Sequence, residues 1–269
     1  MQQTIFITGA STGLGKATAR LFHARGWKVI ATMRQPEKET ELNQLDNVFL
    51  LPLDVTNKEQ IASTVEQAIS LGGVDVVFNN AGYGLMSPLE AMSDAQISRQ
   101  INTNLLGVIL VTQAFIPHFR ERKGGVFIST TSIGGIWGFP LHSLYHATKF
   151  AVEGWSEGMS FELSLFNIGI KTVAPGGIRT EFLGRSLDKS SLPAYQALED
   201  GMVSNIDTMM ASASSAEQIA EVVYEAATDG KDQIRYIAGA DAKEMNAVHE
   251  QLGREGFRQA IKQQFLKQS

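Results

Sequence analysis

The sequence has no cysteine, no block of basic residues and no long hydrophobic run. The lack of cysteine excludes a disulfide framework, a thiolate nucleophile and a metal site with sulfur ligands. The 28 Asp and Glu outnumber the 23 Lys and Arg, for a net charge of −5, so neither nucleic acid nor an anionic membrane is an expected partner. The most hydrophobic run, residues 105–116, is shorter than the ~20 residues of a membrane-spanning helix. The N-terminus lacks the features of a signal peptide, and a cytoplasmic location is therefore expected.

Hydrophobic residues make up 43% of the chain, as in a globular protein. Short hydrophobic runs alternate with segments of helical spacing, and neither a repeat nor a linker interrupts the alternation. This pattern favours a single α/β domain over residues 1–269, a Rossmann-type doubly wound parallel sheet of about seven strands with helices on both faces. Strands are expected at residues 4–7, 29–31, 48–51, 74–78, 125–128, 169–174 and 234–237, and helices at 14–24, 61–69, 105–119 and 143–166.

Two segments lie outside this alternation. Residues 182–214 are less regular and rich in Ser, Leu, Ala and Met, which suits an adaptable substrate loop over a pocket. An ordinary surface loop with short helices is the alternative. Residues 241–269 have the pattern of an amphipathic C-terminal helical tail, which would cover the domain, act as a lid or contact another subunit.

A glycine-rich turn connects the first expected strand to the first helix. Its glycines, Gly9, Gly13 and Gly15, are spaced G-x-x-x-G-x-G. Gly9 would allow a tight turn, Gly13 a close approach of the backbone to a pyrophosphate, and Gly15 close packing of helix on strand. The helix that starts around Leu14 would offer free N–H groups and the positive end of its dipole to the phosphates. The alternative is a flexible turn without a ligand.

The end of the second expected strand bears on the choice of cofactor. An acidic residue about 20 positions after the turn would bind the ribose 2′-hydroxyl of NAD. This chain has Arg34 there, which could pair with a 2′-phosphate, and Ser11 could add a hydroxyl donor. Glu37 lies close by, and Arg34 could also be a solvated surface charge. NADP(H) is therefore the preferred cofactor, and NAD(H) remains open.

Polar residues with the chemistry of proton transfer follow in the second half of the chain. Tyr145 and Lys149 are four residues apart on an expected helix and share a face. An ammonium group beside a phenol stabilises the phenolate, lowers the phenol pKa and makes Tyr145 a usable general acid/base. Ser132 follows the fifth strand, in the crevice where such sheets bind ligands, and Asn104 would open the apolar helix.

Aromatic and histidine side chains surround these positions. Trp137, Phe139 and Pro140 could line a substrate pocket or belong to the core. His142 and His146 have a spacing that could face a metal, but no third ligand accompanies them. We therefore expect the two histidines to be pocket-wall or surface residues, and no metal site.

Taken in order, these motifs resemble those of the short-chain dehydrogenase/reductase family. The resemblance runs from Thr4 to Ile237, and a looser likeness points to the 17β-hydroxysteroid dehydrogenase-like branch. It rests on Thr8-Gly9-x-x-x-Gly13-x-Gly15, Asp54, Asn79-Asn80-Ala81-Gly82, Asn104-x-x-Gly107, Ser132, Tyr145-x-x-x-Lys149 and Pro175-Gly176.

The resemblance implies a role for each matching residue. Tyr145 would exchange a proton with the substrate oxygen, and Lys149 would lower the Tyr145 pKa and bind the nicotinamide ribose. Ser132 would hydrogen-bond the substrate oxygen, and Asn104 would anchor a water that relays protons to Lys149. In the family, the helices that carry Asn104 and Tyr145 commonly form the interface of a homodimer or homotetramer.

The resemblance also implies cofactor contacts beyond the glycine-rich turn. Asp54 would bind the adenine. Further along the chain, the residues that would line the cofactor groove are Asn80, Ala81 and Gly82. Those that would cradle the nicotinamide carboxamide are Pro175, Gly176, Ile178 and Thr180.

These observations predict an NADP(H)-dependent oxidoreductase that interconverts a carbonyl and a secondary alcohol by hydride transfer on a small molecule. A non-catalytic NAD(P)-binding regulator of the same fold is the main alternative, although a regulator would tend to lack Tyr145 or Lys149. An isomerase or dehydratase that uses the cofactor transiently is less favoured, because little chain remains after Ile237.

Overall fold

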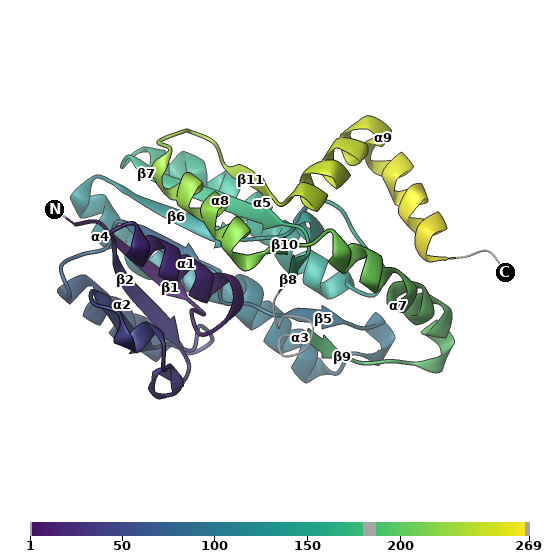
Figure 1. The fold of residues 1–269 in the computed structure, drawn as a ribbon, viewed down its shortest axis with the longest axis horizontal. Helices are drawn as coiled ribbons and strands as arrows, with labels where there is room; N and C mark the ends of the chain where they lie inside the picture. The colour runs from purple at the N-terminus through teal and green to yellow at the C-terminus, as the bar shows by residue number, and fades with distance from the viewer. Residues whose placement is uncertain (1, 180–186, 267–269) are drawn as a thin grey trace.

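The computed structural model describes residues 2–179 and 187–266, apart from the side chains of residues 206–209. Strands and helices alternate along these residues, as Figure 1 shows. The strands are β1 (Thr4–Thr8), β2 (Lys28–Met33), β3 (Val48–Pro52), β4 (Val76–Asn79), β5 (Gly84–Met86), β6 (Gly125–Thr130), β7 (Ile168–Pro175), β8 (Ile178–Arg179), β9 (Leu187–Lys189), β10 (Ser214–Ser215) and β11 (Arg235–Ala238). The α-helices are α1 (Gly13–Ala24), α2 (Lys58–Ser70), α3 (Asp94–Ile101), α4 (Gly107–Arg122), α5 (Ser143–Ser164), α7 (Gln196–Ala211), α8 (Ala216–Thr228) and α9 (Ala240–Phe265).

Seven of the strands form one parallel sheet in the order β11-β7-β6-β4-β1-β2-β3. This confirms the expected Rossmann-type sheet. After β3 the chain crosses to the other side of β1 and continues with β4, so the strand order reverses between β1 and β4. In such sheets, ligands bind beyond the carboxyl ends of the strands at this reversal. The site is therefore expected where Thr8 ends β1 and Asn79 ends β4.

Alternate residues of the central strands point to opposite faces of the sheet. In β1, Ile5 and Ile7 pack into a core with α1 and α8, whereas Phe6 packs with α2, α4 and α5 on the other face. All three side chains have no exposed surface. The sheet thus has a hydrophobic core on each face, which explains why its strands read as continuous apolar runs.

A third hydrophobic cluster lies outside the two faces of the sheet and involves the C-terminal helices. It joins Trp137 and Leu141 to Met202 on α7 and to residues of α9, among them Phe257 and Phe265. In Figure 1, α7 and α9 lie to one side of the main sheet. Gly253 breaks α9 with a positive φ of 67°.

The structure corrects three details of the sequence prediction. Asn104 does not open the apolar helix; it lies in a π-helical turn, Asn102–Leu106, between α3 and α4. Helix α3 itself was not expected, because its eight mostly polar residues give little apolar periodicity. The predicted strand 74–78 begins two residues later, at Val76, since Asp75 accepts a hydrogen bond from the Thr4 backbone and lies ahead of the strand.

Candidate active site

The glycine-rich turn is packed too closely for side chains. Gly9 and Gly13 have positive φ angles of 68° and 54°, which L-residues with a Cβ adopt at a cost. A Cβ on Gly9 would lie 2.8 Å from the Ala81 Cα atom. A Cβ on Gly15 would lie 2.3 Å from the Gly9 carbonyl oxygen and 2.6 Å from the Asn80 side-chain nitrogen. The glycines thus bring α1 against both the turn and the end of β4.

Asn80 and Thr8 hold this turn in place. The Asn80 side-chain amide donates to the carbonyl oxygens of Thr8 and Gly9, each at 3.1 Å. In return, the Thr8 hydroxyl accepts from the backbone N–H groups of Asn80 and Ala81, each at 3.0 Å. The structure therefore brings Asn80 and Ala81 to the turn as expected, but Asn80 acts here by fixing the turn. The sequence analysis did not predict that the Thr8 hydroxyl would hold this turn. The position of Thr8 directly before Gly9 could have indicated it.

The start of α1 is free to receive an anion. Its N-cap residue, Thr12, makes no side-chain capping bond, and its first turn holds no acidic residue. The first N–H groups of a helix need partners and carry a partial positive charge. Beside them lies an open cavity of about 650 Å³, lined by Ser11, Thr12 and Gly13 among others. These residues fit the phosphates of a dinucleotide.

The lining of this cavity is rich in positive charge. Five cationic side chains line it, against the carboxylates of Glu39 and Glu217; the cations are Lys16, Arg20, Arg34, Lys38 and Arg179. Lys16 pairs with Glu39 at 3.1 Å and Arg20 pairs with Glu41. Arg34 is exposed and has no hydrogen-bond or ion-pair partner among the described residues. Glu37, the carboxylate that the sequence places close to Arg34, does not line the cavity. Lys38 and Arg179 were not singled out from the sequence.

Ser132, Tyr145 and Lys149 meet at the carboxyl end of β6. Ser132 precedes a short 3₁₀ turn, Ile133–Gly135, and its hydroxyl accepts from the Gly134 N–H at 3.0 Å. Tyr145 and Lys149 lie one turn apart on α5, with the Lys149 nitrogen 5.7 Å from the centre of the Tyr145 ring. Lys149 is 7% exposed, and its ammonium group donates to the Thr130 carbonyl at 2.7 Å. Three of the four sequence-predicted catalytic side chains, Ser132, Tyr145 and Lys149, are thus brought together.

Burial governs the protonation of this group. It raises the pKa of the Tyr145 phenol, and a hydrogen bond with the Ser132 hydroxyl opposes that shift. It lowers the pKa of Lys149 to about 8, opposed by the Glu153 carboxylate one turn along α5. The pKa of Tyr145 is therefore raised in this structure and not lowered as predicted, because burial of the phenol outweighs the hydrogen bond that favours the phenolate.

The Asn104 side chain is hydrogen-bonded to the backbone of Tyr83. Its amide oxygen accepts from the Tyr83 N–H at 3.1 Å, and its amide nitrogen donates to the Tyr83 carbonyl at 2.8 Å. Asn104 is 1% exposed. A Cβ on Gly82 would lie 3.3 Å from the Asn104 amide oxygen, so Gly82 lies close to it as well. The π-helical turn thus places Asn104 under the segment that follows β4.

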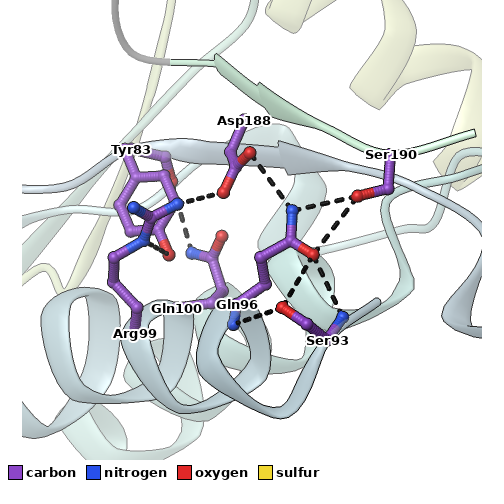
Figure 2. Close-up of polar contacts among 7 residues, drawn as sticks. All are labelled: Tyr83, Ser93, Gln96, Arg99, Gln100, Asp188 and Ser190. Carbon is purple, nitrogen blue, oxygen red and sulfur yellow. Dashed lines mark hydrogen bonds and ion pairs between the residues drawn. The ribbon is translucent and has the colours of Figure 1, made fainter. Parts of the chain in front are cut away.

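Tyr83 also belongs to a network that joins α3 to β9 through Arg99 and Gln96, as Figure 2 shows. The Arg99 guanidinium lies over the Tyr83 ring, 5.1 Å from its centre, donates to the Tyr83 hydroxyl at 3.2 Å and pairs with Asp188. Gln96 donates to Asp188 at 3.2 Å and to Ser190 at 3.0 Å. This network ties β9 to the residue that Asn104 holds. It escaped the sequence analysis because its members come from three separate segments.

The remaining predicted cofactor contacts are spread along the strand ends. Pro175 ends β7 and Gly176 follows it, where a Cβ would lie 2.2 Å from an Asp241 carboxylate oxygen. Ile178 begins β8, and Thr180 lies outside the described residues. Asp54 does not line the cavity; one oxygen of its carboxylate accepts from the N–H and hydroxyl of Thr56, at 2.9 and 2.7 Å.

Two other kinds of site are absent from the described part of the chain. No cluster of three or more His, Asp or Glu side chains there could hold a metal ion. None of the helices described combines the length and hydrophobicity that crossing a membrane requires.

Known proteins share this arrangement. Residues 3–191 match the family model described as short chain dehydrogenase. An uncharacterized oxidoreductase of Schizosaccharomyces pombe is 37% identical over 221 residues, which cover 82% of this chain and 94% of the relative. The 3-ketodihydrosphingosine reductase of Bacteroides thetaiotaomicron is 41% identical over 181 residues, 67% of this chain and 65% of that protein.

Solved structures of short-chain dehydrogenases have the same fold. A short-chain dehydrogenase from Streptomyces avermitilis superposes with a TM-score of 0.81 at 29% identity, covering 93% of this chain and 94% of that one. A short chain dehydrogenase from Burkholderia cenocepacia in complex with NADP gives a TM-score of 0.77 at 25% identity, with full coverage of both chains (100% each). Fold and site thus define an oxidoreductase that acts on CH–OH groups and uses NAD(P). The chain belongs to the short-chain dehydrogenase family.

Proposed function

We propose that this protein is an NADP(H)-dependent oxidoreductase that interconverts a carbonyl and a secondary alcohol, with Tyr145 as the general acid/base. The observation that carries the proposal is the meeting of Ser132, Tyr145 and Lys149 at the carboxyl end of the sheet, on the same edge as the glycine-rich turn. A non-catalytic regulator would have no need of this group.

Each side chain has a distinct part in the reduction of a carbonyl. Bound NADPH supplies the hydride. Ser132 donates a hydrogen bond to the carbonyl oxygen, and Tyr145 donates its proton to the same oxygen as negative charge develops there. A phenol whose pKa is raised by burial holds that proton firmly until then. Lys149 stabilises the resulting phenolate, since its ammonium lies on the Tyr145 side of α5.

The cations that line the cavity support NADP(H) over NAD(H). Arg34 is exposed, without a partner in the described residues, and lines the cavity together with Lys38. A guanidinium binds a phosphate through two parallel hydrogen bonds. We therefore assign Arg34 to the 2′-phosphate, with Ser11 as an added donor.

The hydrophobic cluster around Trp137 supports an apolar substrate. Trp137 and Leu141 follow Ser132 in the chain and are 4% and 8% exposed. The likeness to a 3-ketodihydrosphingosine reductase agrees with such a substrate. Membership of the 17β-hydroxysteroid dehydrogenase-like branch, which the sequence motifs suggest, would agree with it too. A carbonyl on a hydrocarbon frame is the class that we propose.

The proposal is tested by following NADPH oxidation with cyclohexanone, acetophenone, benzaldehyde and decanal. We expect turnover of at least one of these compounds by the wild-type protein. Tyr145→Phe removes only the hydroxyl, and loss of general acid catalysis is worth roughly 10²–10⁴-fold in turnover. NADPH should bind the variant as it binds the wild type. Turnover by Tyr145→Phe at the wild-type rate would overturn the mechanism.

A further inference from the structure

His146, which follows Tyr145 on α5, is buried and has both ring nitrogens engaged. It is 8% exposed. The Phe139 backbone N–H donates to its Nε2 atom at 2.8 Å, so Nε2 carries no proton. The ring proton is therefore on Nδ1, which donates to the Gly134 carbonyl at 2.8 Å. Burial lowers the pKa of His146 to about 4, with the neighbouring His142 acting in the same direction, and the ring is neutral near neutral pH.

The two bonds hold two different parts of the site. Gly134 belongs to the turn after Ser132, and its N–H donates to the Ser132 hydroxyl. A Cβ on Gly134 would lie 2.7 Å from the His146 Nδ1 atom, so turn and ring are in close contact. Phe139 belongs to the segment between Ser132 and α5 and packs against the Trp137 cluster. One imidazole thus joins α5 to the Ser132 turn and to the apolar segment around Phe139.

Other roles for His146 do not fit this geometry. A metal ligand needs a free nitrogen, and both nitrogens are hydrogen-bonded to backbone. His142, the nearest second ligand, has its Nδ1 atom 2.8 Å from the Pro140 carbonyl. A general base needs a nitrogen that reaches substrate, and again neither is free. What remains is the fixing of the two loops.

We propose that His146 is a positioning residue that places Ser132 through Nδ1 and the substrate-pocket wall at Phe139 through Nε2. The kinetic consequences rest on the proposed function above. The turn places the Ser132 hydroxyl against the reacting oxygen, so displacement of the turn lowers kcat. The wall at Phe139 contacts the apolar part of the substrate, so displacement of the wall raises KM.

Two substitutions separate the bonds. In His146→Asn, the amide nitrogen takes the place of Nδ1 and keeps the bond to Gly134, while the bond to Phe139 is lost. In His146→Gln, the amide oxygen reaches the place of Nε2 and keeps the bond to Phe139, while the bond to Gly134 is lost. Both variants keep the rest of α5 unchanged, and each is the control for the other.

The experiment measures kcat and KM with the carbonyl compound of the panel that turns over fastest. For His146→Gln we expect a kcat roughly tenfold lower with KM within about threefold, since small misplacements of a catalytic group are costly in rate. For His146→Asn we expect a KM roughly tenfold higher with kcat within about threefold, from a hydrogen bond worth about 1 kcal/mol and the packing that depends on it. Equal changes in both variants, or none, would overturn the proposal.

Amide hydrogen exchange supplies a readout that does not depend on turnover. The Phe139 amide should exchange slowly in the wild type and in His146→Gln, and at least tenfold faster in His146→Asn. Fast exchange of Phe139 in the wild type would refute the positioning role. If no carbonyl compound turns over, the proposed function fails, and the exchange pattern alone decides whether His146 holds this loop.

Discussion

Gly15 is the residue at which α1 approaches the glycine-rich turn most closely. A Cβ there would lie 2.3 Å from the Gly9 carbonyl oxygen, a backbone atom that cannot move aside alone. Gly15→Ala should therefore destabilise the fold by about 1–3 kcal/mol and weaken NADPH binding, since the turn must shift. Thermal unfolding and NADPH titration check both effects.

The matched control for Gly15→Ala is Gly124→Ala. At Gly124 the nearest atoms to an added Cβ belong to Asn167 and lie 3.9 and 4.0 Å away. This substitution should change the free energy of unfolding by no more than about 0.5 kcal/mol. Similar losses at the two glycines would show that the close approach at Gly15 has no special weight.

At the scale of residues, the sequence indicates which side chains lie together better than it indicates their pKa values and hydrogen bonds. The spacing of Tyr145 and Lys149 on one helix predicted that they share a face, and they do. Their pKa values depend on burial, which a sequence does not give, and the predicted direction for Tyr145 was wrong. The two bonds of His146 join residues 7 and 12 positions apart in loops whose path no periodicity defines.

Helix α3 and strand β9 are the elements that the Tyr83 network connects (Figure 2). The Arg99 side chain is 57% exposed and the Asp188 side chain 23%, so the pair by itself is expected to contribute little. Its attachment to Tyr83 and Gln96 makes it part of a network. In a double-mutant cycle, Arg99→Gln and Asp188→Asn should show a coupling energy of about 0.5–1 kcal/mol in urea unfolding.

An isolated surface pair provides the comparison. Arg258 and Glu255 are 2.9 Å apart and both more than half exposed, at 59% and 76%. The cycle of Arg258→Gln and Glu255→Gln should give a coupling within about 0.3 kcal/mol of zero. A coupling between Arg99 and Asp188 that is no larger than this would contradict the view that they act within a network.

Among the elements, the sequence predicted the seven strands of the sheet, because most of them are buried apolar runs between turn residues. It did not predict the short pairs β5–β9 and β8–β10, whose partners are far apart in the chain. The π-helical turn at Asn104 was missed too, since a one-residue change in hydrogen-bond spacing leaves no mark on hydrophobic periodicity.

At the scale of the whole molecule, one face of α5 lacks a partner within the described chain. Phe161 and Leu165 are 76% and 79% exposed. An added Cβ on Gly158 or Gly154, about one and two turns before Phe161 on that helix, would meet nothing within 4 Å. Exposed apolar side chains next to small residues suit close packing against another helix. We propose that this face contacts a second copy of the chain.

Leu165→Glu should weaken this contact, because a carboxylate buried in an apolar interface has no partner. We expect light scattering coupled to gel filtration to show a homodimer or homotetramer for the wild type and a smaller species for the variant. Val203→Glu on α7 replaces another exposed apolar residue, 64% exposed, and should leave the mass unchanged. A wild-type monomer, or loss of assembly in both variants, would refute the interface.

The central claim is that the cavity beside the glycine-rich turn binds NADP(H), and titration of the protein with NADPH and with NADH, followed by fluorescence, tests it most directly. We predict tighter binding of NADPH. Arg34→Ala should weaken NADPH binding at least about tenfold, from loss of a charge-assisted bond of about 1.5–3 kcal/mol, with little effect on NADH. Arg25→Ala, which removes an exposed arginine paired with Glu221, is the control and should change neither affinity. Tighter binding of NADH, or equal losses of both cofactors in Arg34→Ala, would contradict the account.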